Sequence, residues 1–109
     1  MAITYKVLAQ SAPSATTNTD VYTVGAGKQA TVSTITIANR AATAATYRIA
    51  IRVAGSALSN DEYIAYDATV PANDTVALTL GITLGAADVI TVYASTANLS
   101  VNIFGAEIA

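Results

Sequence analysis

Three short runs of alternating apolar and polar residues fill the last third of this 109-residue chain, and they constrain its fold most strongly. The runs lie within residues 74–84, 87–93 and 99–104. In the first run, Val76, Leu78 and Leu80 fall on one side of an extended chain. Because successive side chains of a strand point to opposite faces, each run has one apolar face and one Thr/Ser/Asn face. The pattern predicts an antiparallel sheet with one side buried.

Earlier segments of the chain are also predicted to be short β-strands. Strands are predicted at residues 3–8, 21–24, 29–38, 47–53 and 61–66. The run at 47–53 alternates most clearly, with Tyr47, Ile49, Ile51 and Val53 on one face, and we expect it to pair with 61–66 as a hairpin. In 29–38, Val32 is out of phase with Ile35 and Ile37, which indicates either a β-bulge or an outward-facing Val32.

The spacing of these runs predicts the fold class. About eight short strands with turn signals every ~8–12 residues are typical of an all-β sandwich or barrel. No stretch has a sustained helical period. We therefore expect residues 1–109 to form a single-domain antiparallel β-sandwich, either jelly-roll-like or immunoglobulin-like. Residues 10–20, which are small and polar with Pro13, are expected to be a loop crossing between sheets or an extended arm on a neighbouring subunit.

Most catalytic chemistry is excluded by composition. The chain has no histidine and no cysteine, so it lacks the usual general base, a thiolate nucleophile and the usual ligands of zinc, copper and iron. Asp61 and Glu62 are adjacent, so on a strand they point to opposite faces and do not make a glycosidase pair. We expect Glu62 to pair with Arg48 or Arg52 across the hairpin. No catalytic or cofactor-binding residue is predicted, and the chain is expected not to be an enzyme.

The sequence does not decide whether the chain binds a structural calcium ion. The hard oxygen donors are Asp61, Glu62, Asp67, Asn73 and Asp74. Their spacing does not match an EF-hand loop. Local bonds from Asn73 and Asp74 to the backbone of a turn explain that pair without a metal, so no residue is predicted as a metal ligand.

The charge pattern argues against two classes of binding partner. The net charge is −2 and the five basic residues are scattered, which disfavours binding to nucleic acid or to anionic lipid. No apolar run approaches the ~20 residues that span a bilayer. The first ten residues lack a basic region followed by an apolar stretch, so we expect a protein made in the cytoplasm without a secretory signal.

The outward-facing positions of the predicted strands are unusually neutral. Charged residues make up 11% of the chain, against roughly 25% in an average domain. The outward residues are expected to be Thr31, Thr34, Thr36, Ala50, Thr79, Thr91, Ser100 and Asn102. Such a face packs readily on another surface, so we hypothesise that the protein belongs to a fixed assembly. Tyr63 and Tyr66 are expected on opposite faces of one strand, which favours a core or interface role for the tyrosines over a sugar-stacking platform.

The chain also resembles small structural proteins of tailed bacteriophages, especially those of cyanobacteria and marine bacteria. The resemblance extends over ITYKVLAQSAP, TDVYTV, STITIANRAATAATYRIAIR, YIAYDATVPANDTVALTLGITL and DVITVYASTANLSVNIFG. It implies a β-sandwich component of the virion. The favoured role is a capsid decoration (cement) protein that stabilises the head, and the alternative is a tail, baseplate or fibre component.

Further expectations about partners and place follow from the resemblance. It implies that the partners are the major capsid protein and further copies of the chain, which would form a homotrimer. It also implies that the protein is assembled in the host cytoplasm and is located on the capsid surface. It implies no catalytic residues. A carbohydrate-binding β-sandwich module is a further alternative of another class, which would need an exposed aromatic platform.

Overall fold

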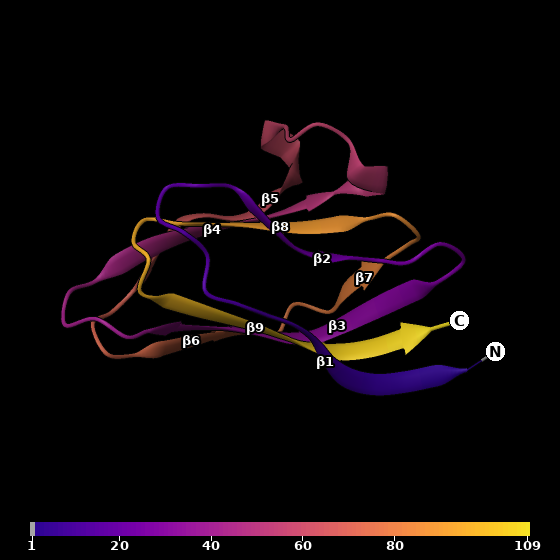
Figure 1. Cartoon of the computed structure of the whole chain (residues 1–109), viewed down its shortest axis with the longest axis horizontal. Coiled ribbons are helices and arrows are strands. Elements are labelled where there is room, and N and C mark those ends of the chain that lie inside the picture. Colours follow the sequence, from indigo (N-terminus) through magenta and orange to yellow (C-terminus); the bar gives the residue numbers. More distant parts are fainter. Residues whose placement is uncertain (1) are drawn as a thin grey trace.

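A computed structural model describes residues 2–109 and shows two antiparallel β-sheets packed face to face (Figure 1). The prediction of an all-β sandwich is confirmed. The elements are β1 (Ile3–Ser11), β2 (Thr19–Thr23), β3 (Gln29–Asn39), β4 (Ala45–Arg52), η1 (Val53–Gly55), η2 (Asn60–Glu62), β5 (Tyr63–Val70), β6 (Thr75–Leu78), β7 (Ile82–Leu84), β8 (Val89–Ala94) and β9 (Leu99–Ile108). No helix within the described residues is long and apolar enough to cross a membrane.

The strand order is that of a jelly roll. Sheet A has the order β1-β9-β3-β6, with β7 also paired to β3, and sheet B has the order β2-β8-β4-β5. The first four strands alternate between the sheets, which produces two Greek keys. An immunoglobulin fold instead keeps its first two strands in one sheet. Of the two predicted sandwich types, the structure therefore has the first, with one strand interrupted to give β6 and β7.

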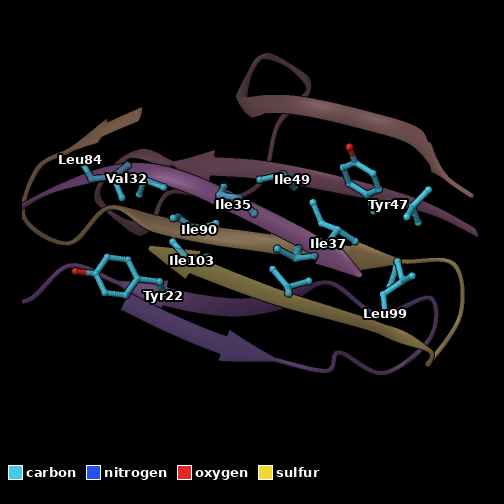
Figure 2. Packing of buried hydrophobic residues seen from close by; sticks show 14 of the residues in the cluster. Tyr22, Val32, Ile35, Ile37, Tyr47, Ile49, Leu84, Ile90, Leu99 and Ile103 are labelled. Atoms are coloured by element: carbon cyan, nitrogen blue, oxygen red, sulfur yellow. The ribbon is translucent and has the colours of Figure 1, made fainter. Parts of the chain in front are cut away.

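The core lies between the sheets and consists of the inward side chains of both (Figure 2). Its fully buried members include Ile35, Ile37, Ile49, Ile90, Val92, Leu99, Val101 and Ile103. The predicted apolar face of 47–53 is confirmed for Tyr47 and Ile49, and the predicted pairing of β4 with β5 is confirmed. Val53 is 64% exposed, because the chain leaves the sheet there and enters η1.

The alternation alone suggested that the three closing runs form one sheet, but the structure divides them between both sheets. β6, β7 and β9 belong to sheet A, whereas β8 belongs to sheet B. Leu80 does not share the buried face of Val76 and Leu78: it is 54% exposed in the break between β6 and β7. Gly81 follows it with φ of 66°, a left-handed conformation that ends regular pairing.

A double bulge bends sheet A beside Phe104. The register of β3 against β9 shifts between Val32 and Thr34, and that of β1 against β9 shifts between Val7 and Ala9. The bulge explains the phase slip seen in the sequence, because it turns Val32 into the core, where it is 1% exposed. The predicted bulge is confirmed, and the alternative of an outward Val32 is wrong.

Several strand boundaries differ from expectation, including the end of β1 and the start of β5. β1 continues to Ser11, and residues 12–18 then cross to sheet B, where the Thr16 amide donates to the Ala94 carbonyl at 2.7 Å. β5 begins at Tyr63 rather than at 61, because Ser59 and Glu62 form a capping box that starts the single turn η2. In Figure 1, η1 and η2 lie on the side of sheet B away from sheet A.

Candidate assembly surface

The outer face of sheet A is the most distinctive surface of the molecule. Residues opposite one another in the strand registers share a face, so the pairing assigns each side chain to the core side or the outer side. The outer face consists of Ile3, Tyr5, Val7, Gln10, Gln29, Thr31, Ser33, Thr34, Thr36, Ala38, Thr75, Ala77, Thr83, Ser100, Asn102, Phe104, Ala106 and Ile108. None of these side chains is charged.

The two charged residues in the strands of sheet A lie on its inner side. Lys6 is opposite Gly105 in the register and Glu107 is opposite Ala30, which is buried. Lys6 Nζ lies 3.2 Å from Glu107 Oε1, and the Tyr22 hydroxyl of sheet B donates to Glu107 Oε2 at 2.7 Å. The charges of sheet A therefore join the two sheets at one end of the sandwich and leave its outer face neutral.

The pKa values of this cluster are shifted by their contacts. The hydrogen bond from Tyr22 and that from Lys6 lower the pKa of the Glu107 carboxyl. Burial, and then the bond to Glu107, raise the pKa of the Tyr22 hydroxyl. Since a carboxyl with a lowered pKa in the folded state stabilises the fold above its unfolded pKa, this contribution is lost as pH falls through the folded value.

Glu107→Gln is expected to reduce the free energy of unfolding by roughly 1 kcal/mol at pH 7, because the charge-assisted bonds become neutral ones. The difference from the native chain should shrink as pH falls from the ordinary glutamate pKa through the lowered folded pKa of Glu107, below which the native carboxyl is protonated as well. Urea unfolding at pH 7 and at pH 3 measures both quantities. Asp61→Asn, at an exposed position of η2, gives the background effect of removing one charge. A difference that stays constant across this pH range would contradict the assignment.

One end of the outer face is apolar and hollowed. A shallow depression of about 480 Å³ is lined by residues of β1, β3 and β9, including the apolar Ile3, Tyr5, Phe104 and Ile108 and also Lys6. Tyr5 is 83% exposed and Ile3 is 50% exposed. A large aromatic ring left in water next to other apolar side chains is typical of a surface that contacts a partner.

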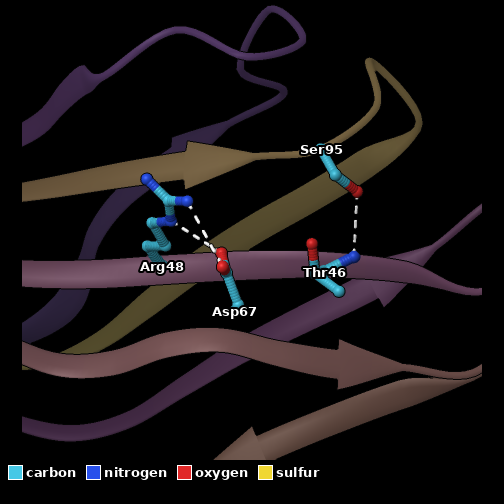
Figure 3. A network of polar contacts seen from close by, with 4 residues as sticks. All are labelled: Thr46, Arg48, Asp67 and Ser95. Atoms are coloured by element: carbon cyan, nitrogen blue, oxygen red, sulfur yellow. Dashed lines mark hydrogen bonds and ion pairs between the residues drawn. The ribbon is translucent and has the colours of Figure 1, made fainter.

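The outer face of sheet B is different, because charged residues on it pair with one another. Arg48 donates to both carboxylate oxygens of Asp67, through Nε at 2.6 Å and a terminal nitrogen at 3.3 Å (Figure 3). The bond from Arg48 lowers the pKa of the Asp67 carboxyl. Arg52 donates to Asp20 at 3.0 Å. This side of the molecule thus has the charges that the other side lacks.

The same face holds three tyrosines, and one prediction about them was wrong. Tyr63 and Tyr66 share a face, with ring centroids 4.9 Å apart in an edge-to-face arrangement. The register of β5 against β4 shifts between its pairs at Ala65 and Tyr63, so one extra residue restores both rings to the same side. The Arg48 guanidinium lies 4.2 Å from the Tyr66 ring centroid and 4.4 Å from that of Tyr93. Each of the three rings therefore has a contact within the chain, and Tyr66 is still 57% exposed.

Two residues expected to face outward are buried. Ala50 is 1% exposed and is opposite Tyr63 in the register. Thr91 is 4% exposed and its hydroxyl donates to Asp20 at 2.8 Å. Both belong to sheet B, so the expected neutral open face is found on sheet A and not on sheet B. The backbone of sheet B is linked further by the Thr46 amide, which donates to the Ser95 hydroxyl (Figure 3).

The carboxylates considered as catalytic or calcium-binding groups are dispersed. Glu62 accepts from the Ser59 amide and the Ser56 hydroxyl, so the expected pairing of Glu62 with Arg48 or Arg52 is wrong. Asp61 contacts the Ser59 hydroxyl, and Asp67 pairs with Arg48.

The carboxylate of Asp74, in the turn before β6, also makes a local hydrogen bond. Asp74 accepts from the Thr75 amide at 2.7 Å, and Asn73 adopts a left-handed φ of 52°. Within residues 2–109, no three His, Cys, Asp or Glu side chains gather as a metal site would require.

The apolar end of the outer face was not identified from the sequence. Tyr5 and Phe104 are almost a hundred positions apart, and only the pairing of β1 with β9 brings their strands together. The available signal was the alternation of Ile3, Tyr5 and Val7, which marked a face of β1 without showing whether that face is covered.

Comparison with known proteins gives no relative for this chain. No protein-family model, no curated protein and no solved structure matches it. The class that the observations define is a jelly-roll domain with one neutral, partly apolar outer face.

Proposed function

We propose that this chain is a non-enzymatic structural protein of a virion, most specifically a decoration (cement) protein that binds the capsid and stabilises the head. The observation that carries the proposal is the outer face of sheet A. It presents no charged side chain, whereas the outer face of sheet B carries two ion pairs. A protein that stays alone in water usually has charges on all sides, so the neutral face is suited to lasting contact.

The assignment to a phage particle depends on the resemblance of the sequence. Two features are consistent with it: jelly rolls are common among capsid proteins, and the chain has no histidine or cysteine for catalysis. In the proposed arrangement, sheet A contacts the shell and sheet B faces solvent. The partners proposed are the major capsid protein and other copies of the chain. A tail, baseplate or fibre component would use the same face against a different neighbour.

Copy number distinguishes these locations. Quantitative mass spectrometry of purified virions should find the chain in numbers comparable with the major capsid protein if it decorates the head, and in far smaller numbers if it belongs to the tail. Its absence from purified particles would contradict both proposals. A mutant lacking the protein should lose head stability in heat or low salt, and unchanged stability would exclude the cement role.

Charge placed on the neutral face should prevent incorporation. Thr36→Lys and Asn102→Lys introduce a cation at the centre of the outer face of sheet A. We expect at least tenfold lower occupancy on particles, because an unpaired charge would be buried at the contact. Thr69→Lys, at an exposed position on sheet B, is the matched control and should be incorporated normally. Equal incorporation of all three variants would show that sheet A does not face the shell.

A carbohydrate-binding module remains as a second candidate because Tyr63 and Tyr66 share a face. A hollow of about 440 Å³ adjoins them and Asn60. Contact of Arg48 with Tyr66 and Tyr93 leaves less ring surface for a sugar, which makes this the weaker proposal. Binding on a glycan array that is lost in Tyr66→Ala would support it, and no binding to any glycan would exclude it.

A further inference from the structure

The free edge of β1 is the one sheet edge in the described structure that is open to pairing over a straight stretch. At the opposite edge of sheet A, β6 and β7 are separated by residues 79–81. In sheet B, β2 has five residues and a register shift, and β5 has two register shifts and a left-handed Asp67. Such irregularities prevent another strand from adding to an edge.

Residues 3–7 of β1 lack these obstacles. The bulge in β1 lies beyond Val7, so the segment before it keeps a continuous register with β9. Lys6, the one charged residue of the segment, points to the inner side and is paired with Glu107. The outward side chains are apolar: Ile3, Tyr5 and Val7 are 50%, 83% and 45% exposed.

The hydrogen bonds of the terminal residues show which backbone groups are free. The Ala2 and Ala109 amides each donate to the other residue's carbonyl, at 3.2 and 2.9 Å, so these two form a hydrogen-bonded pair of the β1–β9 ladder. Hydrogen-bonded and non-bonded pairs alternate along an antiparallel ladder. Thr4 and Lys6 therefore direct their amide and carbonyl groups toward β9, and Ile3, Tyr5 and Val7 direct theirs to the open edge.

We propose that β1 pairs with β1 of a second copy, antiparallel and centred on Tyr5. In this register Tyr5 is opposite Tyr5 of the partner copy, and Ile3 is opposite Val7. All free backbone groups of the segment then find partners, and apolar side chains meet apolar side chains across the two-fold axis. Lys6 is opposite Thr4. Moving the register by two residues to centre on Lys6 would place two lysines opposite each other, which is unfavourable.

The occupant is a second copy because the segment is complementary to itself. The order of apolar and polar side chains from Ile3 to Val7 reads the same in both directions about Tyr5, as two-fold pairing requires. The contact is smaller than a standard stable interface of ~800 Å² per partner, so it should be weak in dilute solution and strengthened where copies are held close together. It uses the strand edge and leaves the centre of the outer face free. It therefore does not depend on the proposed function.

Single cysteines test the register cleanly, since the native chain has none. Tyr5→Cys should form a disulfide-linked dimer on mild oxidation at high protein concentration, because opposite Cα atoms of a hydrogen-bonded pair are ~5.5 Å apart. Ile3→Cys and Val7→Cys should cross-link mainly with each other when mixed, and mass spectrometry distinguishes that mixed dimer from either self-dimer. Thr69→Cys, on the edge strand β5, is the control for random collision.

Sedimentation equilibrium provides a second readout. Tyr5→Lys places like charges opposite each other and should weaken self-association of the purified chain at least tenfold, whereas Thr69→Lys should leave it unchanged. The proposal is overturned if Tyr5→Cys cross-links no faster than Thr69→Cys, or if Ile3→Cys links to itself as readily as to Val7→Cys. Because all measurements use the purified chain, failure here is separate from failure to find the protein in virions.

Discussion

Gly105→Ala is expected to lower the free energy of unfolding by roughly 3 kcal/mol, the largest effect among the substitutions considered. Gly105 lies in β9 opposite Val32, where the bulge in β3 brings the two backbones unusually close. A Cβ atom at this position would overlap the carbonyl oxygen of Thr31 and crowd the Cα of Val32. Since the obstacle is backbone in the middle of a sheet, it cannot move aside as a flexible side chain can.

Urea denaturation of the native chain and the variant measures this loss. Gly85→Ala is the matched control: its added Cβ would make an ordinary contact with the Asp88 carboxylate at 3.7 Å, and it needs no left-handed φ. We expect the control to change stability by less than about 0.5 kcal/mol. Equal effects of the two substitutions would mean that β3 and β9 are not so closely packed at the bulge.

Asn39→Ala is expected to cost about 2–3 kcal/mol, because it removes a buried side chain that connects the loop after β3 to the loop after β5. Asn39 is 4% exposed. Its amide nitrogen donates to the Thr43 carbonyl at 2.8 Å and, more distantly, to the carbonyls of Val70 and Pro71, while its oxygen accepts from the Ala41 amide at 3.0 Å. The variant leaves these buried backbone groups without their partner.

The measurement is again the midpoint and slope of urea unfolding. Asn98→Ala removes the same functional group from an exposed turn and should lie within about 0.5 kcal/mol of the native chain. Asn39→Asp keeps the acceptor for Ala41 and loses the donor, so it should also be strongly destabilised. Native-like stability of both Asn39 variants would show that the loops do not need this side chain.

The fold class could be predicted because alternation is a local property of a strand. Ile35 with Ile37, and Leu99 with Val101 and Ile103, occupy the buried face that their spacing indicated. Strand order could not be predicted in the same way. Whether β8 lies beside β9 or in the opposite sheet depends on contacts distant in sequence, and the alternation of each strand is the same in either case.

A register shift accounts for the wrong faces predicted for Tyr63 and Tyr66. One extra residue reverses the face of every side chain beyond it, so the bulge in β5 was enough to bring Tyr63 and Tyr66 together. Val32 was recognised as out of phase because two isoleucines followed it in regular alternation. The β5 sequence offers no such reference, since polar and apolar residues are mixed throughout it.

The neutral surface was predicted in character, and Thr31, Thr34, Thr36, Ser100 and Asn102, which were expected to face outward, lie on it. Composition indicated too few charges to cover the molecule, and the structure shows that the shortage falls on sheet A. Asp20 and Arg52 are 32 positions apart and Arg48 and Asp67 are 19 apart, so only folding shows that these four charges share the outer face of sheet B. The ion pairs themselves were not predictable from local spacing.

Chemical labelling of single cysteines in assembled particles tests the central proposal most directly. Ala77→Cys lies on the outer face of sheet A and Thr69→Cys on that of sheet B, and both native positions are exposed in the isolated chain. If sheet A faces the shell, a water-soluble maleimide should label Ala77→Cys at least tenfold more slowly in virions than in the purified protein, while labelling of Thr69→Cys stays the same. Equal labelling of Ala77→Cys in both states would contradict the proposal that this neutral face is covered in an assembly.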